Sequence, residues 1–510
     1  MMNKEPQKPS NQAPVINLSG VCKSFGSRTV LETISFSVTG REGLCICGAN
    51  AAGKTTLLRI IAGLLQPGEG MVEVCGFNMA TDSQRIKPML GVIFHKSMVY
   101  PQLTVIENLQ FFARLYGAKN NKMRIQELLE QTGLTPYRYD SAGILSGGMT
   151  QRLAIARALI HKPVVLLADE PFAGLDDQAR KYLIKLMSSF KNDGGTVVMT
   201  THDINLALDC CDKIAVLDDR KLIFSAKISD INTAGFTMDY LSYARKNSNV
   251  FFHCAIPASA ASQADDTDVS YLRSFGNVIK AIFIKDIVSE FRTKQTLPAM
   301  ILLGVVIVWV FRIATEAATG DKPVPAAAVI VAILFSAILA SERGFAVEQQ
   351  NNCISALMLA PVDAGDIYIS KLLVNITMLS AFELVAVPAV LLLFNVNASG
   401  NWLQLAVVLL LTNIGISSIG TLLGCAVQGT RTRNSVLSIL MAAVLCPLMI
   451  PAIFALLLLF GSAGSKAIIG GTLGMVGNFK TALGFMAAFD AIFVTVCWLL
   501  FGFVVSEQEE

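Results

Sequence analysis

Apolar positions follow different patterns in the two halves of this 510-residue chain. Between residues 15 and 245, short apolar runs typical of strands alternate with stretches of helical character. The apolar runs lie at 43–47, 164–168 and 196–200, and two of the helical stretches lie at 150–159 and 178–190. This alternation predicts an α/β domain over residues 15–245.

Six long apolar segments follow in the second half of the chain. Each is close to the ~20 residues with which an α-helix crosses a ~30 Å hydrocarbon layer. The sequence therefore predicts an all-α polytopic membrane domain. The predicted transmembrane spans are 297–314, 324–341, 372–394, 402–427, 436–460 and 482–505.

Composition predicts the remaining boundaries. Residues 1–14 are polar and contain three Pro, which indicates an N-terminal tail rather than a signal peptide. Residues 246–272 are small, polar and acidic, which predicts a linker before a membrane domain at 273–510. Residues 273–296 mix charged with apolar positions and are predicted to form an interfacial helix on the cytosolic leaflet; a soluble amphipathic helix is the alternative.

Charged residues support this division. Residues 1–250 hold 28 Lys or Arg and 22 Asp or Glu, whereas residues 297–505 hold only 16 charged residues, so a wholly soluble enzyme is excluded. The net charge of +3 and the lack of a Lys/Arg cluster argue against a nucleic-acid partner. The eleven Cys show neither a CxxC pair nor Cys/His ligand spacing, which favours reduced packing residues over a redox or metal role.

Basic residues beside the spans predict the orientation of the membrane domain. If both termini are cytosolic, nine Lys or Arg flank the spans inside and four flank them outside. The inner ones are Arg273, Lys280, Lys285, Arg292, Lys294, Arg343, Lys371, Arg431 and Arg433, and the outer ones are Arg312, Lys322, Lys466 and Lys480. This excess favours an N-terminal domain and both termini in the cytosol.

A phosphate-binding motif follows the first apolar run. Gly48-Ala-Asn-Ala-Ala-Gly-Lys54-Thr55 fits G-x-x-x-x-G-K-[ST] between a strand-like and a helix-like stretch. Backbone N–H groups and the helix dipole would hold a triphosphate, with Lys54 at the β/γ-phosphates and the Thr55 hydroxyl on Mg²⁺. The predicted nucleotide-binding residues in this motif are Gly48, Ala49, Asn50, Ala51, Ala52, Gly53, Lys54, Thr55 and Thr56.

Two acids end the second apolar run, at Asp169 and Glu170. Open α/β sheets bind ligands at the carboxyl ends of their strands. Asp169 would then hold Mg²⁺, and Glu170 would polarise the water that attacks ATP. The alternative is a strand end with two solvated acids.

Leu145-Ser-Gly-Gly-Met-Thr-Gln-Arg152 lies between these motifs. It resembles LSGG-x-x-QR, the signature of the ABC transporter ATPases, and the resemblance covers residues 15–225. It implies a P-loop ATP hydrolase of the ABC type. It also implies that Ser146, Gly147 and Gly148 face the γ-phosphate of a second ATPase domain, and hence a homodimer or a related paired assembly.

The resemblance assigns roles to further residues. Ala173-Gly-Leu-Asp176 resembles the D-loop. His202 resembles the switch histidine that contacts the γ-phosphate, so the predicted catalytic residues are Lys54, Glu170 and His202. Phe25 fits the aromatic residue that stacks on adenine, although a core position is the alternative.

One position departs from the family pattern. Where the family has a glutamine that senses Mg²⁺ and couples the ATPase to the membrane domain, this chain has His95 and Lys96. His95 can still coordinate or donate a hydrogen bond, whereas Lys96 cannot bind a cation. Both are candidates for altered coupling, and His95 is a candidate Mg²⁺ ligand.

The membrane half resembles the membrane subunit of the cytochrome c maturation ABC transporter, often called the haem exporter. The resemblance rests on several short segments. They are Phe283–Lys294, Ser341–Phe345 with Glu348, Leu357–Asp363 with Lys371, Arg431–Arg433 before Pro447 and Pro451, and Phe489–Val494, together with Leu103–Gly117 in the ATPase half. It implies a natural fusion of two subunits in the bacterial cytoplasmic (inner) membrane.

Two features of the membrane half suggest a mechanism. The 343–370 loop, with its turn at Pro361 and Asp363, suits a coupling helix that docks on the ATPase; a membrane-surface loop is the alternative. Glu383 and Asp490 lie inside predicted spans, where ionisable side chains usually face protein or water. A conformational or partner-contact role and simple interhelical hydrogen bonding both remain open for them.

Three functions are compatible with these features. All four His precede the first span and only three Trp are present, which argues against axial haem ligation. The favoured function is an ATP-driven conformational change that releases the haem-loaded chaperone from a haem-handling membrane protein. The alternatives are an exporter of haem or another hydrophobic solute, and a regulatory scaffold with little turnover. The expected partners are therefore the other cytochrome c maturation membrane proteins, the haem chaperone and the lipid bilayer.

Overall fold

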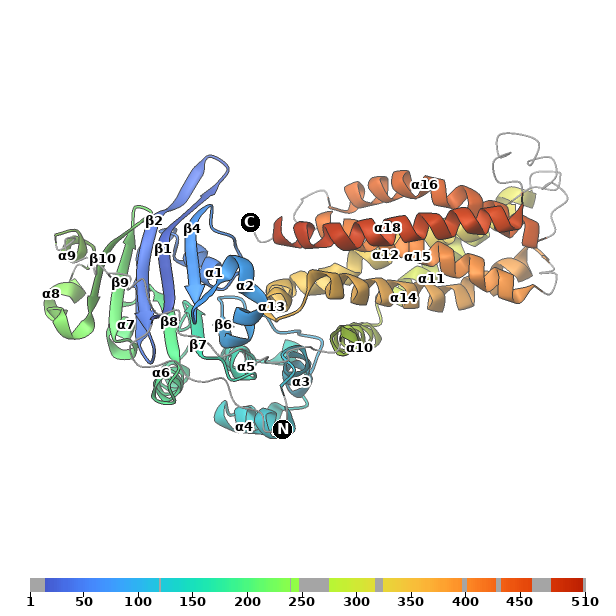
Figure 1. The fold of residues 1–510 in the computed structure, drawn as a ribbon. Coiled ribbons are helices and arrows are strands. Elements are labelled where there is room, and N and C mark those ends of the chain that lie inside the picture. The colour runs from blue at the N-terminus through green and yellow to red at the C-terminus, as the bar shows by residue number, and fades with distance from the viewer. Residues whose placement is uncertain are drawn as a thin grey trace, which may run out of the picture. The chain divides into compact units, whose positions relative to one another are not determined.

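The computed structural model describes residues 14–118, 121–238, 240–246, 275–316, 324–396, 401–427, 433–460 and 478–507 (Figure 1). The predicted tail, except for Pro14, and nearly all of the predicted linker lie outside the described residues. Two compact units are distinguished. The first comprises residues 1–274 with 350–362 and 509–510, and the second comprises 275–349 with 363–508.

The first unit contains two sheets. A six-stranded sheet has the order β10-β9-β3-β8-β7-β6, in which all neighbours are parallel except β10 and β9. Its strands are β3 (Gly43–Cys47), β6 (Leu90–Ile93), β7 (Val165–Asp169), β8 (Thr196–Thr201), β9 (Lys213–Asp218) and β10 (Lys221–Lys227). An antiparallel sheet has the order β2-β1-β4-β5, with β1 (Pro14–Phe25), β2 (Arg28–Thr39), β4 (Glu69–Val74) and β5 (Phe77–Asn78).

The predicted apolar runs form the centre of the larger sheet. Every residue of β3, β6, β7 and β8 is buried, as expected for parallel strands that are covered on both faces. Helices lie between the strands of this unit, and the last two of them follow β10. They are α1 (Lys54–Ile61), α2 (Met79–Ile86), α3 (Val105–Leu115), α4 (Asn121–Gln131), α5 (Gly147–Leu159), α6 (Asp177–Asn192), α7 (Ile204–Cys210), α8 (Thr233–Met238) and α9 (Tyr240–Lys246), with 3-10 turns at Lys87–Met89, Thr135–Tyr137, Ala142–Ile144 and Ile228–Asp230.

Side chains at the helix starts explain several of these boundaries. Thr104 and Glu107 form a reciprocal capping box at the first turn of α3. The Asp176 carboxylate accepts a hydrogen bond from the Ala179 N–H, at 2.7 Å, and caps α6. These caps satisfy backbone donors that would otherwise lack partners at the two helix termini.

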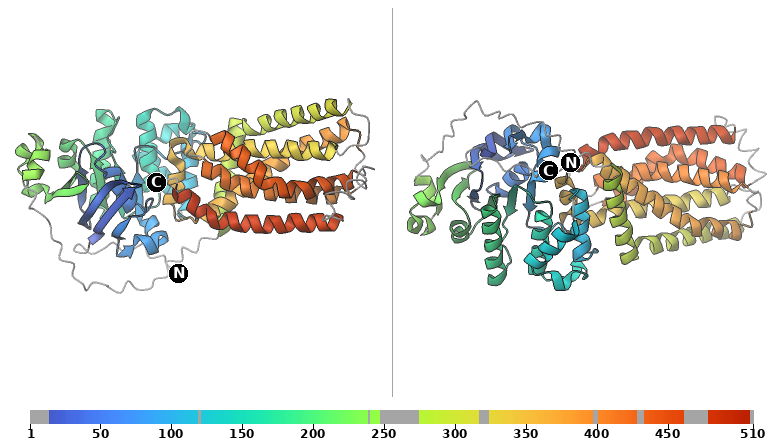
Figure 2. Two further views of the ribbon diagram at one scale, coloured as in Figure 1. Left: turned by 90° about the horizontal axis from the view of Figure 1, so that it is seen from above. Right: turned by 60° about the horizontal axis from the view of Figure 1, so that its bottom comes forward.

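The second unit consists of helices in its described part. They are α10 (Phe275–Thr293), α11 (Thr296–Glu316), α12 (Val324–Gln349), α14 (Ala364–Leu393), α15 (Trp402–Ala426), α16 (Arg433–Leu459) and α18 (Phe479–Glu507). All except α10 contain a stretch long and apolar enough to cross a membrane, which confirms the predicted six-helix domain after an α/β domain. These long helices run side by side in all views (Figures 1 and 2).

Burial identifies the centre of this bundle. In α12 and α15, 67% of the most apolar 18-residue window is buried, against 17% in α11 and 28% in α18. Small residues of α15 allow the close packing: a Cβ on Gly415 would collide with Leu448, and one on Gly420 would collide with the Ser341 hydroxyl. We infer that α12 and α15 form the core, while α11 and α18 expose apolar faces.

Two helices extend further than the apolar segments that predicted them. The second predicted span ends at residue 341, but α12 continues to Gln349, and the third begins at 372, whereas α14 begins at Ala364. Glu348 and Lys371 lie in these extensions and are almost fully buried in mutual ion pairs. Counting apolar residues cannot detect a helix whose charged residues neutralise one another.

Candidate active site

The loop between β3 and α1 carries the phosphate-binding motif. Gly53 has φ +103°, and a Cβ there would lie 2.8 Å from Leu31, so only glycine fits. Lys54 is the first residue of α1 and is buried. Its ammonium donates hydrogen bonds to the carbonyl oxygens of Gly48, at 2.7 Å, and Ala49, at 3.1 Å, which holds the charge over the loop.

Asp169 joins this loop to the end of β7. Its Oδ2 accepts a hydrogen bond from the Thr55 hydroxyl at 2.9 Å, and its Oδ1 accepts one from the Thr200 hydroxyl at 2.6 Å. The side chain is only 4% exposed. The structure therefore brings together Thr55 and Asp169, the two residues that the sequence paired as Mg²⁺ ligands.

Glu170 follows Asp169 in an unusual backbone conformation. Its φ of +46° is rare for a residue with a side chain and is stabilised by a hydrogen bond from its N–H to the Thr200 hydroxyl, at 3.1 Å. Its Oε2 lies 2.9 Å from His202 Nδ1, and its Oε1 lies 3.8 Å from Lys54 Nζ. All three predicted catalytic residues thus meet at one edge of the sheet.

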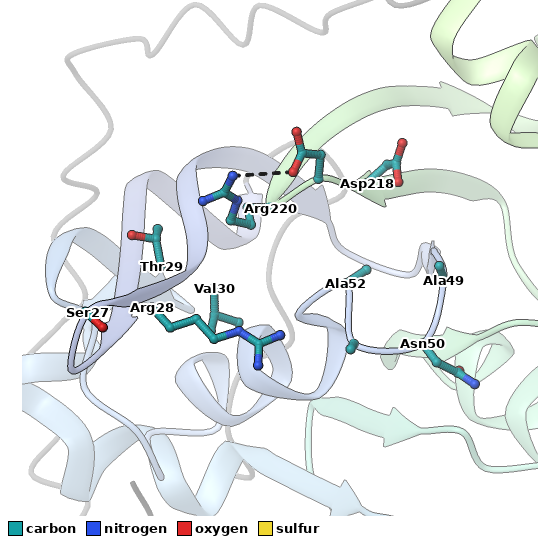
Figure 3. Close-up of a pocket in the computed structure, with 11 residues that line it drawn as sticks. Ser27, Arg28, Thr29, Val30, Ala49, Asn50, Ala52, Asp218 and Arg220 are labelled. Carbon is teal, nitrogen blue, oxygen red and sulfur yellow. Dashed lines mark ion pairs between the residues drawn. The ribbon is translucent and has the colours of Figure 1, made fainter.

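A pocket of about 590 Å³ opens beside the phosphate-binding loop (Figure 3). Three turns line it: the β1–β2 turn, the loop itself and the β9–β10 turn. The lining residues are Ser27, Arg28, Thr29, Val30, Ala49, Asn50, Ala51, Ala52, Asp218, Asp219 and Arg220. The pocket therefore adjoins the loop residues Ala49 to Ala52 that were predicted to bind nucleotide.

Two cationic residues of this pocket were missed from the sequence. Arg28 extends toward the phosphate-binding loop in Figure 3, and Arg220 pairs with Asp219 at 3.5 Å. Neither belongs to a motif, and only the fold brings their turns together. Phe25 is not among the lining residues; it is partly buried, and the Lys23 ammonium lies 5.2 Å from its ring centroid.

The signature residues lie at the start of α5. Ser146 caps the helix by accepting a hydrogen bond from the Met149 N–H at 3.3 Å. Ser146 and Gly147 are exposed, and a Cβ on Gly147 or Gly148 would meet nothing within 4 Å. Within the described residues, no hydrogen bond joins Ser146 to Lys54, Asp169 or Glu170, so the signature presents an open surface.

Residues 350–362, here called the docking segment, belong to the same compact unit as this site. They comprise the turn Gln350–Asn352 and α13 (Cys353–Leu359). Asn351 accepts a hydrogen bond from the Met98 N–H at 3.0 Å and donates one to the Val99 carbonyl oxygen at 3.2 Å. The segment is thus bonded to the loop after β6, the loop that also carries His95 and Lys96.

The far end of the docking segment is also anchored. The Tyr116 hydroxyl donates a hydrogen bond to the Leu359 carbonyl oxygen at 3.3 Å, and Tyr116 stacks on His161 with 3.8 Å between ring centroids. The α13 residues Cys353, Ala356 and Leu357 are completely buried. Of the predicted coupling candidates, His95 and Lys96 are exposed. Pro361 is the penultimate residue of the docking segment, and Asp363 directly follows the segment.

Arg157 connects the signature helix to this region. It is 3% exposed, its Nη2 donates a hydrogen bond to the Val92 carbonyl oxygen at 2.6 Å, and its guanidinium lies 5.5 Å from the Phe112 ring centroid. Burial lowers the pKa of Arg157, while nearby Tyr116 and Cys353 act in the opposite direction. No sequence motif identified this residue.

Glu383 and Asp490 are buried between helices of the second unit. Glu383 Oε2 accepts a hydrogen bond from Asn413 Nδ2 at 3.0 Å, which joins α14 to α15. Asp490 is 5% exposed on α18, and its Oδ1 lies against Gly415, where a Cβ would approach it to 2.5 Å. This geometry fits interhelical packing and leaves a conformational role open as a proposal.

Comparisons with known proteins agree with the two-unit division. Residues 31–173 match the family described as "ABC transporter", and residues 277–500 match the family described as "CcmB protein". The second match agrees with the predicted resemblance to the cytochrome c maturation membrane subunit. Residues 1–30, 174–276 and 501–510 lie outside both matched regions.

The relatives of the first half are ATP-binding proteins. The linearmycin resistance ATP-binding protein LnrL of Bacillus subtilis is 32% identical over 42% of this chain and 70% of its own length. The Nod factor export ATP-binding protein I of Ralstonia nicotianae is 36% identical over 46% and 74%. A solved "ATP binding subunit of ABC transporter" is 26% identical, covers 46% of this chain and 99% of its own, and has a TM-score of 0.43.

These findings and the site geometry agree on one family. The first half of the chain aligns with 70% and 74% of the length of two ATP-binding proteins, and a distinct family model matches residues 277–500 in the second half. The chain belongs to the ABC transporters, as an ATPase domain fused to a CcmB membrane domain.

Proposed function

We propose that ATP hydrolysis in the first unit drives a conformational change of the six-helix unit during cytochrome c maturation. The docking segment carries this proposal. It lies in the chain between two membrane helices, α12 and α14, yet it is hydrogen-bonded at both ends to the ATPase domain. The change would release the haem-loaded chaperone from a haem-handling membrane partner.

The site residues divide the hydrolysis chemistry among them. Lys54 and the N–H groups of its loop would hold the β- and γ-phosphates and offset their charge. Glu170 would orient the attacking water and accept its proton, with His202, 2.9 Å away, fixing the carboxylate. Phe25 remains our candidate for adenine stacking, next to the pocket that Arg28 lines.

The Thr55 hydroxyl and the Asp169 carboxylate would hold Mg²⁺. Both are hard oxygen donors, which Mg²⁺ prefers, and they already lie 2.9 Å apart. The ion would neutralise charge on the phosphate oxygens. His95 is exposed on the loop after β6 and remains a candidate for an additional ligand.

The open signature surface suits a second copy of the chain. Ser146, Gly147 and Gly148 would complete the site of a partner ATPase domain, because the N–H groups and the dipole at an exposed helix start favour an anionic phosphate. We therefore propose a homodimeric or related paired assembly. We place it in the bacterial inner membrane, with the ATPase domain and both termini in the cytosol and the other cytochrome c maturation proteins as partners.

The test compares Glu170→Gln with the matched surface variant Glu127→Gln, whose carboxylate is half-exposed on α4. Each would be the sole copy of the protein in cells that make c-type cytochromes. We expect Glu170→Gln to abolish holo-cytochrome formation and to retain the chaperone on a co-purifying membrane protein, whereas Glu127→Gln leaves both unchanged.

Two results would contradict the proposal. Normal maturation with Glu170→Gln would favour the regulatory scaffold. ATP-dependent accumulation of haem or another solute in proteoliposomes that contain only this chain would favour the exporter.

A further inference from the structure

Four charged side chains of the second unit form a buried group that the hydrolysis chemistry does not use. Lys285 Nζ lies 2.5 Å from Glu348 Oε1 and 2.7 Å from Asp286 Oδ1. Lys371 Nζ lies 2.8 Å from Glu348 Oε1 and 3.0 Å from Asp286 Oδ2. These residues, here called the charge cluster, contain two cations and two anions and are therefore balanced.

The charge cluster differs from an ordinary surface ion pair because its side chains are buried. Lys285 is 4% exposed, Lys371 is 3% exposed and Glu348 is fully buried. Buried ion pairs give little net stability, because desolvation offsets their attraction, but removal of one partner leaves an uncompensated charge. Their best-attested use is to fix the register of the elements that they join. The cluster is thus better suited to positioning than to stabilisation.

Two of the three helices that the cluster joins directly flank the docking segment in the chain. Glu348 is the penultimate residue of α12, immediately before the segment, and Lys371 lies two turns into α14, which follows it. Lys285 and Asp286 come from α10, the helix that precedes the first span. Both ends of the docking segment therefore continue into helices that are held to α10.

Further contacts join α12 and α14 to each other and to α18. Lys371 Nζ also donates a hydrogen bond to the Gly344 carbonyl oxygen at 3.1 Å, which adds a link between α14 and α12. Phe501 of α18 packs against Phe345 and Tyr368, with ring centroids 6.2 Å and 5.5 Å apart. A displacement that enters at α12 or α14 would therefore reach α10 and α18.

We propose that the charge cluster is a positioning device that transmits movement of the docking segment to α10 and the membrane spans. This inference rests on the proposed function. Glu348 and Lys371 alone would connect α12 to α14. The addition of Lys285 and Asp286 brings α10 into the same body, so the cluster predicts that α10 moves with the docking segment during the ATP cycle.

The test removes α10 from the cluster without leaving an unbalanced charge. The double variant Lys285→Met/Asp286→Asn deletes one positive and one negative charge and leaves the Glu348–Lys371 pair intact. The control is Lys280→Met, which makes the same lysine-to-methionine substitution at an exposed position of α10. Each full-length variant is compared with the wild type for membrane level, ATP hydrolysis and holo-cytochrome yield.

We expect the double variant to hydrolyse ATP within about twofold of the wild type but to form at least tenfold less holo-cytochrome per ATP hydrolysed. Lys280→Met should match the wild type in both. Because the yield is normalised to hydrolysis, a purely structural role of the cluster would not change it. A normal yield per ATP, or a parallel loss of hydrolysis and maturation at normal protein level, would overturn the proposal.

A second balanced variant keeps the test decisive if the first does not accumulate. Lys285→Met/Glu348→Gln leaves the Asp286–Lys371 pair and removes the ion pairs of α12 instead of those of α10. The same loss of yield per ATP is expected, and an unchanged yield would refute the inference. Glu170→Gln is assayed in parallel. If Glu170→Gln matures cytochromes normally, the proposed function fails; if it does not but the balanced variants do, only the role of the cluster fails.

Discussion

The hydrolysis site and the charge cluster both combine lysines with acids, but they differ in how tightly the charges are paired. In the site, Lys54 and Glu170 are 3.8 Å apart, and the side chain of His202 is 67% exposed. In the cluster, all four ion pairs are between 2.5 and 3.0 Å long, and three of the four residues are almost fully buried. An open, loosely paired arrangement can receive a substrate, whereas a closed and balanced one can only hold helices together.

The substitution expected to have the largest effect is that of Glu170, in the hydrolysis site. We expect Glu170→Gln to lower ATP turnover by about 100-fold or more, since general-base catalysis contributes roughly 10²–10⁴-fold. Thermal stability should change by less than about 2 °C, because the variant retains the size of the side chain. Steady-state phosphate release and a thermal melt of the purified chain would check both. A variant that melts much earlier would show that Glu170 is structural.

Removal of one charge from the charge cluster should have the opposite effect, with the main loss in folding stability. Lys371→Met leaves one net negative charge buried, which costs about 3–5 kcal/mol of folding free energy. Adding Asp286→Asn should restore most of that loss, since the pair Lys285–Glu348 then remains balanced. Thermal melts in detergent, with the two single variants and the double variant, form the cycle that measures this coupling. Additive effects of the two substitutions would disprove the pairing.

A substitution at the docking segment should have a smaller effect than a substitution in the hydrolysis site or in the charge cluster. Tyr116→Phe removes the hydroxyl that bonds the Leu359 carbonyl oxygen and should cost about 1 kcal/mol at that contact. We expect a few-fold loss of holo-cytochrome per ATP hydrolysed, with hydrolysis itself unchanged. Tyr139→Phe, on an exposed tyrosine of the same unit, is the control. Equal behaviour of the two variants would mean that this hydrogen bond does not contribute to coupling.

The smallest effect is expected at the position where the family has glutamine. His95→Gln introduces the family residue on an exposed loop, so the fold should be unaffected. Because this loop is bonded to Asn351 through Met98 and Val99, we expect a change of about two- to fivefold in ATP turnover, an order-of-magnitude estimate for one lost or gained hydrogen bond. Unchanged turnover would indicate that His95 substitutes fully for glutamine.

Contiguous motifs explain why the sequence could predict that the candidate site residues lie close together. Lys54 and Thr55 are the first two residues of α1, directly after the phosphate-binding loop, and Asp169 and Glu170 lie at the end of one strand, so strand order alone brings them together. Arg28 and Arg220 could not be predicted, since their turns meet only through the pairing of separate strands. The placement of Phe25 as an adenine platform stays a prediction.

Residues that are far apart in the chain explain what the sequence missed in the membrane half. Lys285 and Lys371 counted as basic residues that favour a cytosolic flank, but the structure buries both against Glu348. Their partner lies 63 residues from Lys285 in the chain, and no spacing rule joins them. For the same reason, the apolar segments did not reveal how far α12 and α14 extend beyond the predicted second and third spans.

Lys54→Ala, in the complete chain and as its sole copy in the cell, tests the central claim most directly when hydrolysis and holo-cytochrome yield are measured in the same membranes. We expect both to be lost while the protein still inserts at its normal level. Holo-cytochrome formation that persists without hydrolysis would contradict the claim that ATP turnover in the first unit does work on the membrane helices.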